Sequence, residues 1–179
     1  MDLVTGEQLA VDFVNTLTSE FDALDDPQPW LRLQAERLAP PARSLTEADR
    51  VALRTLRELV RAAIDAVRQG APPPAAAINA VNRAIQAAPA YPVLNADLRV
   101  LTRRDGDARA TLLAQLAEAA VELLTDPHAN RIRACEGPQC RMLFLPAHPN
   151  RRWCSAALCG NRVRVARYYQ RHKANPISS

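Results

Sequence analysis

The feature that most constrains this sequence is a group of four cysteines, the only ones in its 179 residues. They are Cys135, Cys140, Cys154 and Cys159, with the spacing C-x4-C-x13-C-x4-C. Two close pairs joined by a short loop can bring four thiolates to one tetrahedral Zn²⁺ ion. We therefore predict one zinc ion. Its role is structural, because four thiolate ligands leave no open coordination position for catalysis.

Other roles for the cysteines remain open. Two disulfides are disfavoured in a reducing compartment. Four buried, inert thiols would not need this spacing, and a zinc site that releases its metal on oxidation would have the same sequence as a structural one. His148 could replace a ligand, although four cysteines already satisfy the ion. The N-terminus lacks the basic segment of a signal peptide, and no apolar run approaches the ~20 residues of a membrane span. We therefore expect a cytoplasmic protein that does not bind membranes.

Charge is distributed unevenly along the chain. Residues 131–179 carry 10 basic and 1 acidic side chains, whereas residues 1–130 carry 13 basic and 18 acidic ones, so the net charges are +9 and −5. A basic module on an acidic body is typical of nucleic-acid binding, and we predict DNA as the partner. The alternative is a basic segment that docks on its own acidic domain.

Periodicity predicts a mostly α fold with a small β element. The expected helices are 6–22, 29–38, 46–69 (capped by Thr46 with Asp49), 74–88 and 110–125. A strand is expected at 95–103, followed by a turn at Asp105-Gly106 that could lead to a short partner strand. Residues 1–128 should form a helical N-terminal domain. Residues 131–173 should form a treble-clef-like zinc finger with four cysteine ligands, in the order knuckle, hairpin and helix. Residues 174–179 should form a flexible tail.

Five arginines lie on one side of the 46–69 helix: Arg50, Arg54, Arg57, Arg61 and Arg68. They could bind phosphates. However, acidic residues flank them at helical spacings of three and four, namely Glu47, Glu58 and Asp65. This pattern favours a solvated, ion-paired face over a phosphate site.

The last helix, 161–173, carries the predicted DNA contacts. On a helical wheel Arg164, Arg167 and Arg171 fall within about 60° of each other, so we predict that they contact phosphates. Arg151, Arg152 and Lys173 would extend this surface. Asn161 could pair with an adenine edge or cap the helix. The opposite face is expected to pack on the knuckle and consists of Arg162, Val165, Ala166 and Tyr169. There Arg162 would bond knuckle carbonyls or a thiolate, and the alternative for Arg162 is a DNA contact. Trp153 is expected to pack against the zinc core.

The N-terminal domain offers a weaker candidate for a ligand site. Asp12, Asn15 and Thr16 share the polar edge of the first helix, where they could bind a small-molecule effector or satisfy a neighbouring loop. No enzyme motif is present: there is no glycine-rich phosphate loop, no GxSxG and no HExxH. We therefore expect no catalytic activity.

Two motifs carry a family resemblance. "RRWCSAALCGNRVRVARYYQR" at 151–171 resembles the CGNR zinc-finger family, and "LAVDFVNTL" at 9–17 resembles the start of the ABATE domain that precedes it. The resemblance implies a bacterial transcription regulator linked to stress. The four cysteines would bind zinc, the finger would bind DNA, and the first domain would act as a sensor or ligand-binding domain. One departure is Leu145-Pro146, where relatives often have an acidic residue, and it makes the hairpin geometry uncertain.

A single finger covers a small DNA footprint, so specific binding would need a homodimer or a second contact surface. The rival function is a protein-interaction or RNA-binding module that uses apolar residues such as Leu143 or Phe144 instead of the arginines.

Overall fold

The computed structural model describes residues 5–39, 41 and 43–173, with backbone alone at 167 and 170–173. The predicted tail at 174–179 lies outside the described residues. The N-terminal elements are α1 (Leu9–Val14), α2 (Gln28–Leu33), α3 (Glu47–Arg68), α4 (Ala75–Ala87), β1 (Ala90–Leu94), β2 (Val100–Arg104) and α5 (Ala108–Thr125). The C-terminal elements are the 3-10 turn η1 (Ala129–Arg131), β3 (Arg133–Ala134), β4 (Leu143–Phe144), the π-type turn η2 (Ala156–Gly160) and α6 (Asn161–Lys173). The predicted fold class, mostly α with a small β element and a four-cysteine C-terminal region, is confirmed.

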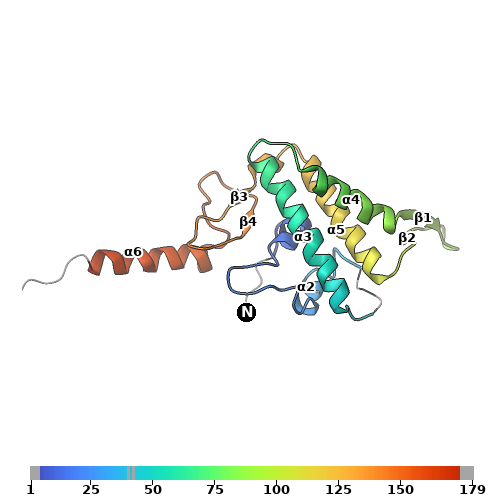
Figure 1. Ribbon diagram of the computed structural model, residues 1–179, viewed down its shortest axis with the longest axis horizontal. Coiled ribbons are helices and arrows are strands. Elements are labelled where there is room, and N and C mark those ends of the chain that lie inside the picture. The colour runs from blue at the N-terminus through green and yellow to red at the C-terminus, as the bar shows by residue number, and fades with distance from the viewer. Residues whose placement is uncertain (1–4, 40, 42, 174–179) are drawn as a thin grey trace, which may run out of the picture.

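The helical body is built around α3, α4 and α5 (Figure 1). α3 begins where predicted, because Thr46 accepts a hydrogen bond from the amide of Asp49 and Asp49 accepts one from the amide of Thr46. The apolar stripe of α3 is buried against α1 and α5 at Leu53, Val60 and Ile64. Within the described residues, no helix has both the length and the apolar character needed to cross a bilayer.

The first helix is much shorter than the predicted 6–22. α1 ends at Val14, and an antiparallel bridge between Leu17 and Asp22 then reverses the chain. Hydroxyl groups drive this early end. Thr16 donates to the carbonyl of Phe13 (2.7 Å), and Thr18 accepts from the amide of Phe21 (3.0 Å). Such local bonds offer the backbone an alternative to the helical ladder.

The segment predicted as a strand at 95–103 contains a turn and β2, and the partner strand, β1, precedes it in the chain. β1 pairs with β2 in antiparallel register from Ala90↔Arg104 to Leu94↔Val100. The turn is formed at 95–99, where the side chain of Asn95 accepts from the amides of Asp97 and Arg99. The predicted turn at Asp105-Gly106 instead leads into α5, which Asp107 caps.

The zinc-finger region divides into two parts. Its first part, β3 and β4, forms a short ladder with the register Arg133↔Phe144 and lies against the helical body. Its second part, α6, projects away from the body (Figure 1). The hairpin therefore closes around the first cysteine pair. The treble-clef assignment stays a prediction.

Candidate zinc centre and nucleic-acid interface

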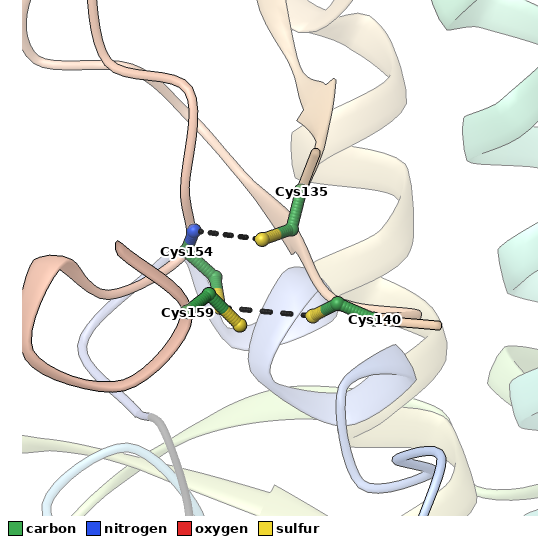
Figure 2. A group of neighbouring side chains, drawn as sticks. All are labelled: Cys135, Cys140, Cys154 and Cys159. Atoms are coloured by element: carbon green, nitrogen blue, oxygen red, sulfur yellow. Dashed lines mark hydrogen bonds between the residues drawn. The ribbon is translucent and has the colours of Figure 1, made fainter. Parts of the chain in front are cut away.

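Four thiol groups from two chain segments converge at one point (Figure 2). Cys135 and Cys140 lie in the loop between β3 and β4. Cys154 precedes η2, the turn that leads into α6, and Cys159 lies within it. All four sulfur atoms lie within 4.8 Å of one another. The Sγ–Sγ distances are 3.8 Å for Cys140–Cys154 and 3.6 Å for Cys154–Cys159. A tetrahedron with Zn–S bonds of about 2.3 Å has edges of about 3.8 Å, so the cluster fits one zinc ion.

The backbone around the cluster is arranged to support thiolates. The Cys135 sulfur accepts hydrogen bonds from the amides of Gly137 (3.4 Å) and Cys154 (3.3 Å). Gly137 is required by the close approach of the two segments, because a Cβ atom there would lie 3.1 Å from the Cys159 sulfur. These contacts hold the two cysteine pairs together on one side of the site.

Hydrogen bonding within the cluster separates the acidities of the thiols. Hydrogen bonding with Cys154 lowers the pKa of Cys140 to about 5. Hydrogen bonding with Cys140 raises the pKa of Cys154, and burial raises that of Cys159 to about 12. Hydrogen bonding within the cluster therefore favours the thiolate form of Cys140 and the protonated forms of Cys154 and Cys159. Zinc must displace the remaining protons, so zinc affinity falls as the pH falls.

A small apolar cluster surrounds the cysteines. Met142 and Phe144 are buried in it, and Trp153 packs against it. A Cβ atom on Gly160 would lie 3.3 Å from the Trp153 ring, which shows how closely the indole covers the start of α6. The predicted packing of Trp153 against the zinc core is confirmed by these contacts.

The knuckle, which is the loop of the first cysteine pair with β3 and β4 on either side, docks on the helical body through a polar and an apolar contact. The side-chain amide of Asn15 donates to the Leu143 carbonyl (2.8 Å), and its oxygen accepts from the Leu143 amide (2.8 Å). The Leu143 side chain is 0% exposed and belongs to the core of the helical body. Arg61 of α3 also donates to the carbonyl of Arg141 (2.7 Å). The first half of the finger and the helical body therefore share one packed interior.

Arg151 is part of this docking and was predicted differently. Its guanidinium donates to the Cys154 carbonyl (2.7 Å), pairs with Glu7 (3.0 Å) and lies over the Phe144 ring at 4.4 Å. Glu7 also accepts from the amide of Leu145 (3.0 Å). These bonds leave Arg151 few free donors, and its role as a phosphate contact stays a prediction.

Two other arginines of the finger form ion pairs. Arg152, which is half exposed, pairs with Glu136. Arg162 pairs with Glu20 of the N-terminal domain (3.1 Å) and is also half exposed. Arg162 was expected to bond knuckle carbonyls or a thiolate, and it does neither. The alternative of a basic segment docking on its own acidic body is therefore realised in part, by Arg151 and Arg162.

α6 is exposed along the part of its surface that the structure describes. Arg164 is exposed, and it makes no ion pair or side-chain hydrogen bond with any described residue. The side chains of Arg167, Arg171 and Lys173 lie outside the described residues, but the helical backbone places positions 167 and 171 on the face of Arg164. Among the described side chains of this face, Arg164 is therefore the one that lies unshielded, on the helix that projects from the body.

The opposite face of α6 does not pack on the knuckle as expected. Val165 is 44% exposed and Tyr169 61% exposed, and Ala166 and Arg162 are exposed as well. The expectation assumed that apolar helix residues must be buried within the chain. Asn161 is also exposed. The chain enters α6 through η2, which Ser155 caps by accepting from the amide of Leu158, so Asn161 does not have the capping role considered for it.

The three candidate ligand residues of the N-terminal domain are all engaged by the protein. The Asp12 carboxylate accepts from the amides of Gly6 and Glu7 (both 3.1 Å) and pairs with Arg37. Asn15 holds the zinc knuckle, and Thr16 bonds to Phe13 and accepts from Arg57 (3.1 Å). These contacts favour the structural alternative, because the polar atoms already bond to the protein, and the ligand role stays a prediction.

The arginines of α3 are held in ion pairs, as their flanking carboxylates indicated. Arg57 is an exception to the predicted solvated face, because it is only 3% exposed and makes two hydrogen bonds to Asp22, of 2.6 and 2.7 Å. Sequence reasoning missed acidic partners that lie in loops, among them Glu7, Glu20 and Asp22. Because their arginine partners are 35 to 144 residues away, periodicity carries no signal for these pairs.

Comparison with protein-family models matches nearly the whole described chain. Residues 7–127 match the ABATE model, whose description is "Putative stress-induced transcription regulator". The chain belongs to the ABATE family. Residues 131–172 match the model of the CGNR zinc finger, which contains the four clustered cysteines. The predicted family and its single zinc ion are thus confirmed. Comparison with proteins of curated function finds no match.

Proposed function

We propose that this ABATE-family chain is a bacterial, cytoplasmic transcription regulator that binds DNA through α6. The observation that carries the proposal is the cationic face of α6, represented among the described side chains by Arg164, on a helix that stands clear of the body (Figure 1). A helix exposed over several of its faces fits the major groove of a duplex without rearrangement. The chain acts by binding, and we propose no catalytic step for it.

Phosphate contacts supply most of the proposed affinity. Because the guanidinium of Arg151 already bonds to the protein, the leading candidates are five other cationic residues: Arg152, Arg164, Arg167, Arg171 and Lys173. Arg152 would have to leave Glu136, an exchange that is inexpensive for an exposed ion pair. If about five cations meet phosphates, the slope of log affinity against log salt is about −4 to −5.

Recognition of the DNA base sequence would come from the neighbouring face of α6. Asn161 can pair with an adenine edge, and Val165 can contact a thymine methyl group. One helix of 13 residues covers a small site, so we propose that specific recognition uses two copies of the chain on two half-sites.

The zinc ion shapes the finger in this proposal and takes no part in the contact with DNA. Cys135, Cys140, Cys154 and Cys159 would hold it in the interior, where it joins the docked knuckle to the start of α6. The N-terminal domain would sense a small effector. A change in that domain can reach the finger, because the two parts share Leu143 in one core.

A second candidate function, capture of a protein partner, is favoured by the apolar face of α6. Val165, Tyr168 and Tyr169 are exposed at spacings of three and four, and the two tyrosine rings stack edge to face with centroids 5.8 Å apart. Leu143 and Phe144, first considered for this role, are 0% exposed and are thereby removed from it.

The test is a fluorescence-anisotropy titration of the zinc-loaded protein with duplex DNA at several salt concentrations. The variant Arg164→Ala/Arg167→Ala/Arg171→Ala, checked for retained zinc, is compared with a control variant. The control changes three exposed arginines of the body, Arg32→Ala/Arg99→Ala/Arg103→Ala. The proposal expects a steep salt slope that only the first variant flattens. Absence of binding at ~50 mM salt by a folded, zinc-loaded protein would refute duplex binding and leave protein capture as the better candidate.

A further inference from the structure

The helical body contains an open groove that its own side chains do not fill. The groove lies between α3, α4 and α5 and has a volume of about 420 Å³, within the range of small-molecule sites. Five of its eleven lining residues are alanines, contributed by all three helices, and leucines such as Leu59 and Leu113 form the walls. Alanine side chains are too short to close the space between the helices, so a furrow remains.

The charged residues of the groove are of one sign. Arg83 of α4 and Arg109 of α5 line it, and among the described residues no carboxylate does. Arg83 makes no ion pair or side-chain hydrogen bond with any described residue. The nearest acidic group to Arg109 is Asp49, at 3.9 Å, which is too long for a hydrogen bond.

Asp49 does not compete strongly for Arg109. Its two oxygens already accept from Arg43, from the amide of Thr46 and from the Thr46 hydroxyl. The guanidinium groups of Arg83 and Arg109 therefore retain donors for a bound anion.

We propose that this groove binds an amphipathic monoanion: a carboxylate that pairs with Arg83 and Arg109, attached to an apolar chain or ring that lies against the alanines. A charge-assisted contact to guanidinium suits a carboxylate, and the alanine walls suit a hydrocarbon. A nucleotide or a sugar phosphate fits less well, because its hydroxyl groups would face alanine and leucine side chains without partners. The inference rests on the sensing role proposed above, and it gives that role a site and a class of ligand.

α3 connects the groove to the zinc finger. Leu59 faces the groove, and Arg61, two residues later, donates to the carbonyl of Arg141 at the zinc knuckle. A ligand that shifts α3 would therefore move a contact of the finger. The groove is thus placed to act on the same part of the chain that positions α6.

The test is isothermal titration calorimetry of the full zinc-loaded chain with octanoate, in the absence of DNA. Octan-1-ol serves as the neutral ligand of the same length. We expect saturable binding of one octanoate per chain, with octan-1-ol at least tenfold weaker. Arg83→Gln and Arg109→Gln should each weaken octanoate binding about tenfold, which is about 1.4 kcal/mol. Arg32→Gln, an exposed arginine of α2, should leave it unchanged.

A variant that fills the groove separates this site from binding elsewhere. Ala84→Leu places a larger side chain in the open space, and it should abolish octanoate binding without lowering the melting temperature. The proposal is overturned if octanoate does not bind, if octan-1-ol binds as well, or if the arginine and Ala84→Leu variants bind like the parent protein. Because no DNA is present, such a failure leaves the proposed DNA binding untouched.

Discussion

The two halves of the zinc finger place their arginines in opposite surroundings. The knuckle half is residues 131–154, and the helix half is η2 with α6. In the knuckle half, Arg151 bonds to a carbonyl, pairs with Glu7 and lies over Phe144. In the helix half, Arg164 stands exposed on a helix that leaves the body (Figure 1). The comparison teaches that the positive charge of this region has two roles, since part of it joins the finger to the body and part is left for a partner.

The halves also differ in how they depend on the rest of the chain. Leu143 is part of the helical core and is held at its backbone by Asn15, whereas α6 packs mainly on the turn that precedes it. The zinc cluster lies between them, with one cysteine pair beside β3 and β4 and the other beside α6. The metal therefore links a fixed part of the finger to a projecting one.

Removal of zinc should have the largest effect on the link between the two halves of the finger. Chelation should unfold the knuckle and withdraw Leu143 from the core, because zinc binding to a small finger is worth about 10–16 kcal/mol. We expect a lower melting temperature for the whole chain, measured by circular dichroism, and a change in Trp153 fluorescence. A chelated protein that melts at the original temperature would contradict the shared core.

Truncation of the docking leucine tests the fixed half alone. Leu143→Ala should lower the free energy of unfolding by about 2–5 kcal/mol, as expected for a buried leucine. Leu94→Ala, at an exposed leucine of β1, is the matched control and should change it by less than about 0.5 kcal/mol. Denaturant titration measures both. Equal effects would show that the knuckle does not pack on the body.

The two arginines should separate stability from binding. Arg151→Ala should cost about 1–2 kcal/mol of stability, because it breaks several partly buried hydrogen bonds. Arg164→Ala should leave stability unchanged and make the salt slope of DNA binding shallower by about 0.9. Paired denaturant and anisotropy titrations give both quantities for each variant. A loss of stability from Arg164→Ala, together with a shallower salt slope from Arg151→Ala, would contradict the roles assigned to these two arginines.

A smaller effect concerns the acidic loop that meets α3. Burial raises the pKa of Asp22. The hydrogen bond from Arg57, the backbone hydrogen bond from Leu24 and the charge of Arg57 lower it by more, so the pKa of Asp22 lies below the ordinary 3.8. The Asp22–Arg57 contribution is therefore present above about pH 4 and is lost as the pH falls through the folded pKa. Asp22→Asn should lose less stability than the parent protein on acidification from pH 5 to pH 3. Asp25→Asn, at an exposed carboxylate, should behave like the parent.

Local signals in the sequence predicted the parts of the fold that depend on neighbouring residues. The cysteine spacing predicted the metal cluster, and Thr46 with Asp49 predicted the start of α3. The end of α1 was missed because the threonine hydroxyls that compete with the helix look compatible with it.

Long-range contacts escaped the sequence for a different reason. The pairing of Asn15 with Leu143 spans 128 residues, and that of Glu7 with Arg151 spans 144. No periodicity records such a distance. The packing of α6 was predicted wrongly, because its apolar residues were assumed to need burial within the same chain, and the structure leaves them exposed.

The most direct test of the account is hydrogen–deuterium exchange of the zinc-loaded chain, with and without duplex DNA. In the free protein, the Leu143 amide, bonded to Asn15 and buried, should exchange slowly, and the amides of α6 should exchange fast. Added DNA should protect α6 and leave Leu143 unchanged. Protection that appears on the helical body, or an α6 that DNA leaves unprotected, would contradict the division of the finger into a docked half and a binding half.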